Sequence, residues 1–416
     1  MPNCLIKKMH MNWKLFFLCF LFVSANVVEA KDPRQKIDLW KGPTQLRGVN
    51  IHQSLVMELD GGTKGTGAMG SPFNLQDFKE MAALGANYVN ISHAGPSSEK
   101  APFLVDERVL KNLDHLLAMI QQADMFAVIS IRSGPGRSEL TFVFGQDNAS
   151  DPVNGWFPPS MYNDTVWTDK TARDAWIEMW RTLARRYKDN PIVVGYDLMV
   201  EPNANEIFFK IYDGKSFYQK YRGTGYDWNS WYPTLVAAIR EVDKKTPVLV
   251  QPMGYGRADW LPFLQASQDS KIVYAIHQYE PFAYTHQQNT RLRYPNVLEK
   301  VDRSTLEGIC TQVDKFLSTV KGGMAAVNEY GLHRDNPGAE LYLADMLALF
   351  EKRGWNHALW AWYPAHFIKH RPPIETSFDL RFGANVKNVK PVANPLQDAV
   401  LKYWKLNRAR PSNTRY

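Results

Sequence analysis

Short runs of β-branched and aromatic residues alternate with longer amphipathic stretches along most of the chain. This alternation predicts parallel strands joined by right-handed helical crossovers. We expect eight strands, over residues 45–51, 88–92, 127–132, 192–199, 247–251, 272–279, 325–330 and 357–362.

Helices are expected between these strands, over residues 75–84, 106–123, 171–187, 227–242, 305–320 and 340–352. Several begin at Asp, Ser or Thr and end before Gly or before the Asn190-Pro191 pair, which are common start and stop signals. The pattern favours an α/β fold, the (β/α)8 TIM barrel, as a single domain over residues 31–405. An open, doubly wound sheet is the structural alternative. A barrel would carry its working residues at the C-terminal ends of its strands.

The longest insertion, residues 133–169, follows the third predicted strand and is rich in aromatic residues. These are Phe142, Trp156, Phe157, Tyr162 and Trp167. We expect this insertion to form a loop over the active face. Residues 406–416 are polar, and we expect them to form a loose C-terminal tail.

The first thirty residues resemble a signal for export. Lys7, Lys8 and Lys14 precede an apolar run over 15–23, and a small-residue cleavage box ends at Ala30. A short membrane anchor is the alternative, but the run is shorter than the roughly 18 residues that a membrane span needs. We therefore expect residues 1–30 to be removed and the mature protein to be secreted, with no membrane span.

Composition excludes some classes of partner and of covalent cross-link. The formal charge is +7, and removal of residues 1–30 leaves 46 basic against 41 acidic residues. The surplus is gathered near the C-terminus, at Lys402, Lys405, Arg408, Arg410 and Arg415, which favours a solvated segment over a nucleic-acid surface. Cys310 would be the single cysteine left, so no intramolecular disulfide is expected, and its apolar spacing predicts a buried thiol.

Two glutamates stand where predicted strands end. The fourth strand runs into the segment DLMVEPN (197–203), which carries Glu201, and the seventh runs into AAVNEYG (325–331), which carries Glu329. Strands four and seven lie across the mouth of such a barrel, so both carboxylates can face one glycosidic bond. Two carboxylates with separated pKa values are what glycoside cleavage needs. For a retaining enzyme the two carboxyl groups should lie roughly 5 to 5.5 Å apart.

These strand ends resemble those of glycoside hydrolase family 5, the endoglucanase and mannanase group. The resemblance implies that Glu201 is the acid/base and Glu329 the nucleophile, and that His277 and Tyr279 form the His-x-Tyr of strand six. Tyr279 would donate a hydrogen bond to Glu329, and His277 would bond to Glu201 or to the sugar. Trp360, ahead of Trp355 and Trp362, matches the tryptophan that the family stacks beneath the sugar.

The sequence also departs from the family pattern at three positions. Val200 stands where most members have the Asn that bonds the sugar 2-hydroxyl, Asn90 stands at the usual Arg, and Arg132 stands at the usual His. We expect the Arg132 guanidinium to orient Glu329 in place of the missing Arg, which requires a separation below about 6 Å. Asn203 is a candidate to reach the 2-hydroxyl instead of Val200, or else caps a helix.

The sequence favours an enzyme that needs no cofactor. It contains no His-Glu-x-x-His or Cys-x-x-Cys metal spacing, no Gly-rich phosphate loop after the first strand and no Gly-x-Ser-x-Gly elbow. With the family resemblance, we expect a monomeric retaining endo-β-glycosidase with a polysaccharide partner. The loop over 280–287 is similar to one found in some endoglucanase-like members, and this resemblance implies a β-1,4-glucan. A β-mannanase or another β-glycan hydrolase, and a catalytically impaired carbohydrate-binding barrel, are the alternatives.

Overall fold

The computed structural model describes residues 34–53, 73–138, 163–289, 291–364, 376–414 and 416. The predicted signal over 1–30 lies outside these ranges. Residues Arg34–Tyr416 form one compact unit. Within the described ranges, no helix is long and apolar enough to cross a membrane.

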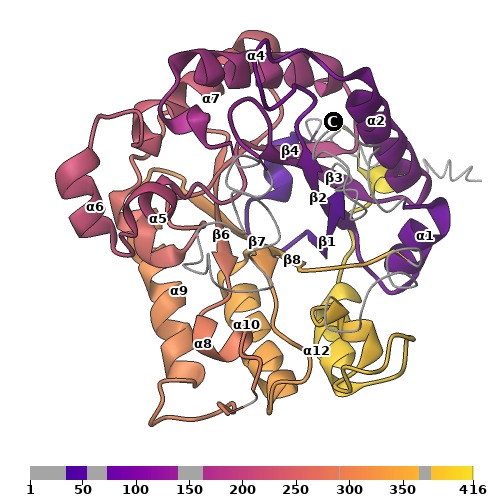
Figure 1. The fold of residues 1–416 in the computed structure, drawn as a ribbon. Helices are drawn as coiled ribbons and strands as arrows, with labels where there is room; N and C mark the ends of the chain where they lie inside the picture. Colours follow the sequence, from indigo (N-terminus) through magenta and orange to yellow (C-terminus); the bar gives the residue numbers. More distant parts are fainter. Residues whose placement is uncertain (1–33, 54–72, 139–162, 290, 365–375, 415) are drawn as a thin grey trace, which may run out of the picture. The chain divides into compact units, whose positions relative to one another are not determined.

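Eight parallel strands of the described residues close into a barrel in chain order, which confirms the predicted fold (Figure 1). The last strand pairs with the first, with Arg47 opposite His357. The strands are β1 (Arg47–Gln53), β2 (Tyr88–Ala94), β3 (Phe126–Ser133), β4 (Val193–Asp197), β5 (Val248–Val250), β6 (Ile272–Gln278), β7 (Met324–Tyr330) and β8 (Asn356–Leu359). Each predicted strand matches an observed one, with ends that differ by a few residues.

Helices cover the outside of the barrel (Figure 1). Those that match predicted segments are α1 (Leu75–Ala83), α2 (Glu107–Gln122), α4 (Lys170–Tyr187), α7 (Tyr232–Val242), α9 (Arg303–Leu317) and α10 (Ala339–Arg353). The sequence did not predict α5 (Ala204–Phe209), α6 (Gly214–Tyr221), α8 (Phe282–Thr285) or α12 (Pro395–Trp404). The first three are short and lie in loops after β4 and β6, where the tertiary packing determines local structure more than periodicity does.

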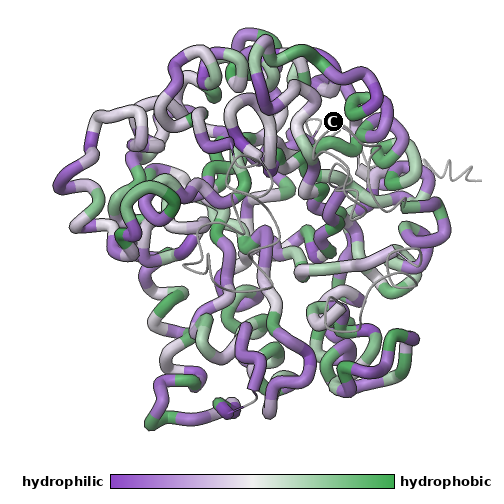
Figure 2. The backbone as a smooth tube through the Cα atoms, in the orientation of Figure 1, coloured by the Kyte–Doolittle hydropathy of each residue, from purple (hydrophilic) through white to green (hydrophobic). Residues whose placement is uncertain are grey.

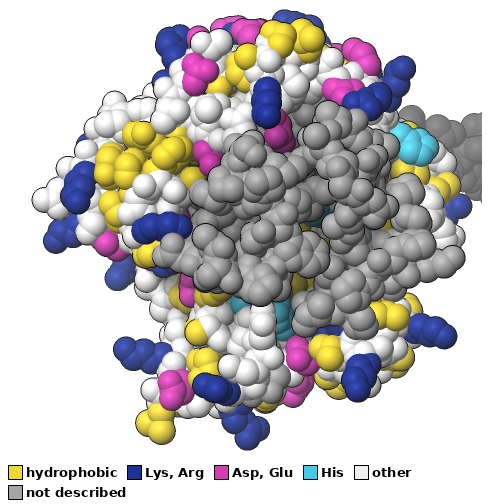
Figure 3. Space-filling model, in the orientation of Figure 1, with side chains coloured by type: hydrophobic (Ala, Val, Ile, Leu, Met, Phe, Trp, Pro, Cys, Tyr) yellow, Lys and Arg dark blue, Asp and Glu magenta, His cyan; other side chains and the backbone are white. Residues whose placement is uncertain are grey.

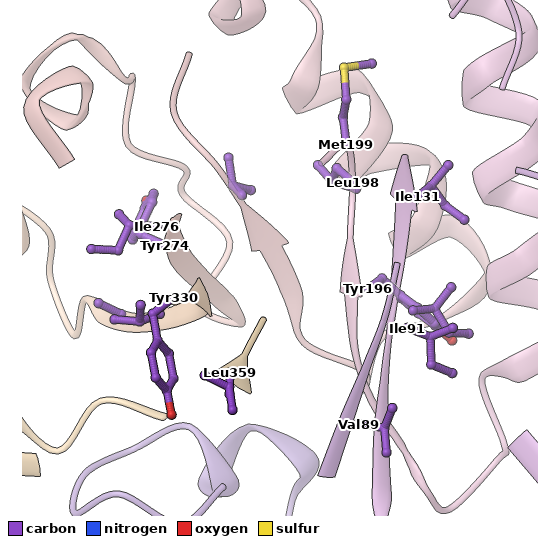
Figure 4. Packing of buried hydrophobic residues seen from close by; sticks show 14 of the residues in the cluster. Val89, Ile91, Ile131, Tyr196, Leu198, Met199, Tyr274, Ile276, Tyr330 and Leu359 are labelled. Atoms are coloured by element: carbon purple, nitrogen blue, oxygen red, sulfur yellow. The ribbon is translucent and has the colours of Figure 1, made fainter. Parts of the chain in front are cut away.

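The main hydrophobic core lies between the strands and the helices. Outward-facing side chains such as Val89, Ile91, Tyr196, Ile276 and Tyr330 pack there, as Figure 4 shows. Along the outer helices, hydrophobic and hydrophilic residues alternate (Figure 2), as expected for helices with one buried face. Cys310 is buried in this core as a free thiol, as predicted.

A second hydrophobic cluster fills the N-terminal half of the barrel interior. It combines inward-facing strand residues such as Tyr88, Phe126 and Leu249 with Trp40, which follows the short 3-10 helix η1 (Lys36–Leu39). The Trp40 indole donates a hydrogen bond to the Val194 carbonyl of β4 at 2.9 Å. This end of the barrel is therefore plugged by side chains, as a packed barrel core requires.

Only part of the predicted loop over the active face can be compared with the structure. Phe142, Trp156, Phe157 and Tyr162 lie outside the described residues. Trp167 is fully buried in the core and packs edge-on against Trp228 and Trp231. Its assignment to a loop over the active face is therefore wrong, because its large apolar ring is buried against other indoles instead.

The prediction of a loose tail is also wrong for the described residues between Leu406 and Tyr416. Asn407 donates to the carbonyls of Arg47 and Gly85, and Arg410 donates to that of Ala86. Tyr416 packs edge-on against Phe126. This segment satisfies carbonyl groups at the N-terminal ends of strands, and its polar composition reflects those bonds instead of solvation.

An ion-pair cluster connects the closing seam of the barrel to α10. Arg47 of β1 holds Glu351 through two hydrogen bonds of 2.6 and 2.7 Å, and His357 of β8 lies 3.0 Å from the same carboxylate. Burial alone would raise the pKa of Glu351, but the hydrogen bonds from Arg47 and His357 outweigh it and lower that pKa to about 2. The carboxylate therefore stabilises the fold in its ionised form.

We predict that Glu351→Gln lowers the free energy of unfolding by about 3 kcal/mol at pH 7, because Arg47 loses its charged partner. A lowered folded-state pKa gives stability that is present above the unfolded value and lost as the pH falls toward 2. The gap between wild type and variant should therefore shrink from pH 5 to pH 2 in urea denaturation. Glu340→Gln, on the same helix outside the cluster, is the control. A gap that stays constant with pH would contradict this assignment.

Candidate active site

A cavity of about 600 Å³ opens at the C-terminal ends of the strands. Both predicted glutamates line it, together with His277, Tyr279, Trp360 and Arg132. The remaining lining residues are Glu206, Tyr212, Tyr255, Arg257, Glu280, Phe282, His286 and Phe378. The barrel therefore brings together six of the seven residues that the sequence predicts for the site.

Glu201 follows β4 in a left-handed backbone conformation, with a φ of 55°. Such a conformation costs about 1 kcal/mol or more for a residue with a Cβ atom, so the surroundings must hold it. The Glu201 amide donates to the Gln251 side chain at 2.9 Å, and the Glu201 carbonyl accepts from Arg137 at 2.7 Å. The side chain is 14% exposed and faces the cavity.

Glu329 lies on β7, and its side chain is only 3% exposed. The Tyr279 hydroxyl donates to one of its oxygens at 3.0 Å, and the Arg132 guanidinium donates to the other at 2.9 Å. The Arg132 separation is well inside the limit of about 6 Å that its expected role requires. Both contacts that the sequence analysis expected for Glu329 are present.

An irregularity in the β6–β7 pairing positions this glutamate. Ile276 is opposite Val327, whereas the next residue, His277, is opposite Glu329. One extra residue in β7, Asn328, therefore lies between the two pairs. Successive residues of a regular strand point to opposite faces, and such a bulge changes the direction of side chains. Asn328 and Glu329 accordingly both make contacts inside the barrel.

His277 lies between the two glutamates. Its Nδ1 atom is 2.7 Å from a Glu201 oxygen and 3.3 Å from a Glu329 oxygen. Burial favours the neutral ring, but the charges of Glu329 and Glu201 outweigh it and raise the pKa of His277 above its usual value. The histidine can therefore donate to either carboxylate as an imidazolium.

Burial acts on both carboxyl groups, and their cationic neighbours act against it. For Glu329, burial prevails and raises the pKa, although His277 and Arg132 oppose it. For Glu201, the hydrogen bond from His277 outweighs burial and lowers the pKa. The charge of Glu201 is itself one of the causes that raise the pKa of Glu329, so the titration of each carboxyl group affects the other.

Arg132 of β3 stands at the position of the usual His and contacts Glu329, as the missing Arg was expected to do. Its Nε donates to Ser92 of β2 at 2.7 Å, and its Nη1 lies 3.8 Å from Glu201. The guanidinium carbon also lies 5.1 Å from the centre of the Trp360 ring, a cation–π contact. The Arg132 guanidinium thus contacts both glutamates and Trp360, the tryptophan predicted to stack beneath the sugar.

A ring of buried polar residues lies beneath the glutamates. Its members are Asn50, Asn90, Ser130, Asp197, Gln251 and Asn328. Asp197 accepts from Gln251 at 2.7 Å and from Asn328 at 2.6 Å, and burial raises the pKa of Asp197 to about 6. The Gln251 side chain also accepts a hydrogen bond from the Glu201 amide. Asp197 is therefore linked to Glu201 through Gln251, and to the strand that carries Glu329 through Asn328.

The structure does not bring Asn203 to the cavity. Its side chain is fully buried and accepts from Arg137 at 3.5 Å. It stands at the start of α5 but makes no side-chain cap, so neither expected role is present. Val200 is buried as well, so no side chain at that position reaches the cavity. Trp355 and Trp362 are core residues, which leaves Trp360 as the tryptophan of the three in the cavity.

Several cavity residues were missed because they lie in loops. Tyr255 sits between Gly254 and Gly256, and all three have left-handed backbones. Tyr255 donates its amide to the Pro202 carbonyl, so this turn closes against the turn that carries Glu201. The spacing Gly-x-Gly after a strand signals a tight turn, but it does not show which segment the turn contacts.

The sequence matches the family described as cellulase (glycosyl hydrolase family 5) over residues 38–366. The chain belongs to glycosyl hydrolase family 5. Cellodextrinase A of Ruminococcus flavefaciens is 23% identical over 211 residues, which cover 51% of this chain and 52% of that protein. Endoglucanase C of Acetivibrio thermocellus is 26% identical over 151 residues, 33% of this chain and 38% of that protein. The chain spans about half or less of the length of these relatives.

Solved structures confirm the fold. Thermotoga maritima Cel5A, in complexes with cellobiose and with mannotriose, superposes with a TM-score of 0.58 at 16% identity. The match covers 89% of this chain and 100% of that one. At this identity the likeness concerns the barrel architecture.

Within this family 5 site, Glu201, His277 and Glu329 each offer one ligand atom, and these atoms lie within 4.8 Å of one another. Such a cluster has the composition of a metal site. However, Arg132 donates to Glu329 and Tyr279 donates to its second oxygen, so both oxygens already accept hydrogen bonds. A cation there would have to compete with a fixed guanidinium, so the donor set fits a proton-transfer pair better than a metal site.

We predict that Arg132→Met raises the pKa of Glu329 further, because the carboxylate loses the nearest permanent cation. Arg132→Lys should raise the pKa of Glu329 less, because the lysine keeps the positive charge. A single ammonium group cannot, however, contact Ser92 and both glutamates as the guanidinium does. The pKa can be read from carboxyl ¹³C resonances of glutamate-labelled protein, assigned with Glu329→Gln. Arg257→Met, on the cavity rim, is the control. An unchanged Glu329 titration in Arg132→Met would refute the charge role.

Proposed function

We propose that this chain is a retaining, endo-acting β-glycosidase that hydrolyses a β-1,4-glucan. The observation that carries the proposal is the Glu201–Glu329 pair, with one oxygen of each within 4.8 Å of the other at the cavity floor. Retaining enzymes hold their carboxyl groups roughly 5 to 5.5 Å apart, whereas inverting enzymes leave roughly 6.5 to 9.5 Å for a water. Membership of family 5 supports the same reaction.

In this mechanism Glu329 attacks the anomeric carbon while Glu201 protonates the departing oxygen. Glu201 then takes a proton from the water that releases the sugar from Glu329. The bonds from Tyr279 and Arg132 stabilise Glu329 as an anion when it leaves the intermediate. Burial raises the pKa of Glu329, whereas positive charge that develops at the anomeric carbon favours its ionised form.

The cavity supports a chain-like substrate. A second cavity of about 400 Å³ shares Phe282 and His286 with the first, so the cleft continues past the glutamates. Phe282 is 47% exposed and stacks on His286 at 4.0 Å and 13°. Burial lowers the pKa of His286 to about 3, so the stacked pair is uncharged at neutral pH. Exposed hydrophobic residues such as Phe208 and Tyr212 gather over α5 and α6 on the same face (Figure 3).

A β-mannan is the second candidate substrate. Glucose and mannose differ only in the orientation of the 2-hydroxyl, and Val200 removes the amide that reads this group in most members. Thermotoga maritima Cel5A, which shares this fold, has been solved in complex with cellobiose and with mannotriose. A binding-only barrel is less well supported, because Arg132 contacts both glutamates and so supplies a cation where the usual Arg is missing.

Export remains part of the proposal. The Lys-rich start, the apolar run and the small-residue box of residues 1–30 support a signal peptide, and a polysaccharide substrate would be met outside the cell.

We predict that Glu201→Gln lowers kcat/KM on a soluble glucan by about 10² to 10⁴-fold, and that Glu329→Gln lowers it at least as much. The first product seen by proton NMR should be the β-anomer, since two displacements retain configuration. The assay should include glucan, mannan and other β-glycans in parallel. Binding to these polymers without release of reducing ends by wild type would favour the carbohydrate-binding barrel.

We predict that Phe282→Ala raises KM on polymeric substrate by about tenfold, the equivalent of one lost stacking contact. The same variant should change kcat/KM on a short aryl glycoside less than twofold, because its leaving group is too small to reach the second cavity. Leu341→Ala, an exposed hydrophobic residue of α10 outside both cavities, is the control. Equal losses on long and short substrates would argue against an extended cleft.

A further inference from the structure

We infer that Arg137 is a positioning residue for Glu201, one that holds the backbone of the acid/base in the conformation that points its carboxyl group into the cavity. This inference rests on the proposed function, since it assigns a purpose to the geometry of the proton donor. Arg137 does not line the cavity and touches no substrate-facing atom of Glu201. It acts through the main chain.

Arg137 reaches Glu201 from a tight turn after β3. The turn Gly134–Arg137 is closed by hydrogen bonds in both directions between its end residues. Gly136 has a φ of 69°, and a Cβ atom there would lie 2.6 Å from the Val166 amide. The turn is thus fixed by its own bonds and by close packing, and it delivers the side chain to a segment more than sixty residues further along the chain.

The Arg137 guanidinium donates hydrogen bonds to two consecutive carbonyl groups. Nη1 donates to the Val200 carbonyl at 2.8 Å, and Nη2 donates to the Glu201 carbonyl at 2.7 Å. The Glu201 amide is held separately by Gln251 at 2.9 Å. The peptide groups on both sides of the Glu201 Cα atom are therefore fixed, and with them the direction of its Cα–Cβ bond.

These hydrogen bonds matter because Glu201 has a φ of 55°, which a residue with a Cβ atom does not adopt without support. If the peptide returned to an ordinary conformation, the carboxyl group would leave the 2.7 Å contact with His277 and its place near Glu329. A planar guanidinium suits the task, since it offers two parallel donors at a fixed spacing.

A buried arginine that only stabilises the fold gives a useful comparison. Arg334 is also fully buried, and its guanidinium donates to the carbonyls of Gly383, Asn385, Val386 and Asn388. It does not line the cavity. Arg137 and Arg334 are therefore both buried arginines that donate to main-chain carbonyls. They differ in that one of the carbonyls bonded by Arg137 belongs to Glu201, whereas none of those bonded by Arg334 belongs to a residue that lines the cavity.

The test uses the dependence of rate on the leaving group. A dinitrophenyl glycoside departs without a proton, whereas a phenyl glycoside needs one from Glu201. We expect Glu201→Ala and Arg137→Met to lower kcat/KM about 10²-fold on phenyl β-cellobioside and less than fivefold on the 2,4-dinitrophenyl analogue. Azide, which attacks the glycosyl-enzyme without a general base, should restore kcat of both variants on the dinitrophenyl substrate.

Arg334→Met is the control for a loss of stability, and it should lower kcat/KM on both substrates by the same factor. Arg137→Lys, which keeps the charge with one donor group, provides a second reading if Arg137→Met does not fold, and we expect an intermediate dependence on the leaving group. Thermal midpoints of all variants are measured alongside the rates.

Two failures are distinguishable. Equal losses on both substrates in the Arg137 variants, with a clear leaving-group dependence in Glu201→Ala, would overturn the role of Arg137 and leave the proposed function intact. If Glu201→Ala itself shows no such dependence, Glu201 is not the proton donor, and both the proposed function and this inference fall.

Discussion

The repulsion between two buried carboxylates is the constraint on which this structure depends. Glu201 and Glu329 approach within 4.8 Å in a place largely shielded from water, where like charges are costly. Arg132 and His277 offset that cost by contacting both carboxylates at once. Arg132 is in turn held in place by a hydrogen bond to Ser92. Arg132 therefore supplies, from β3, the positive charge that the usual Arg would supply at the position of Asn90.

The barrel interior is layered to serve that pair. Apolar side chains fill its N-terminal half, the polar ring around Asp197 lies above them, and the glutamates lie at the mouth. From the N-terminal end to the mouth, hydrophobic packing thus gives way to hydrogen bonds. Hydrogen bonds within this polar ring hold the strand ends in place. Apolar side chains at the same positions would contribute more hydrophobic burial, so the fixed site geometry costs some stability.

The sequence predicts what depends on local pattern. Strand ends mark Glu201, Glu329, His277 and Tyr279, because a barrel gathers all strand ends at one face. The errors concern residues whose surroundings come from distant segments. Trp167 joins an indole cluster, and Asn407 and Arg410 bond strand ends that precede them by hundreds of residues. Gln251 and Arg137 were missed for the same reason, since their value lies in contacts with Glu201 that no spacing reveals.

The indole of Trp40 has a consequence for the movement of protons. With Trp40 bonded to Val194 and the lower cluster packed around it, the N-terminal end of the barrel offers water no direct path to Asp197. Any proton that Asp197 gains or loses must then travel through the mouth, past the glutamates.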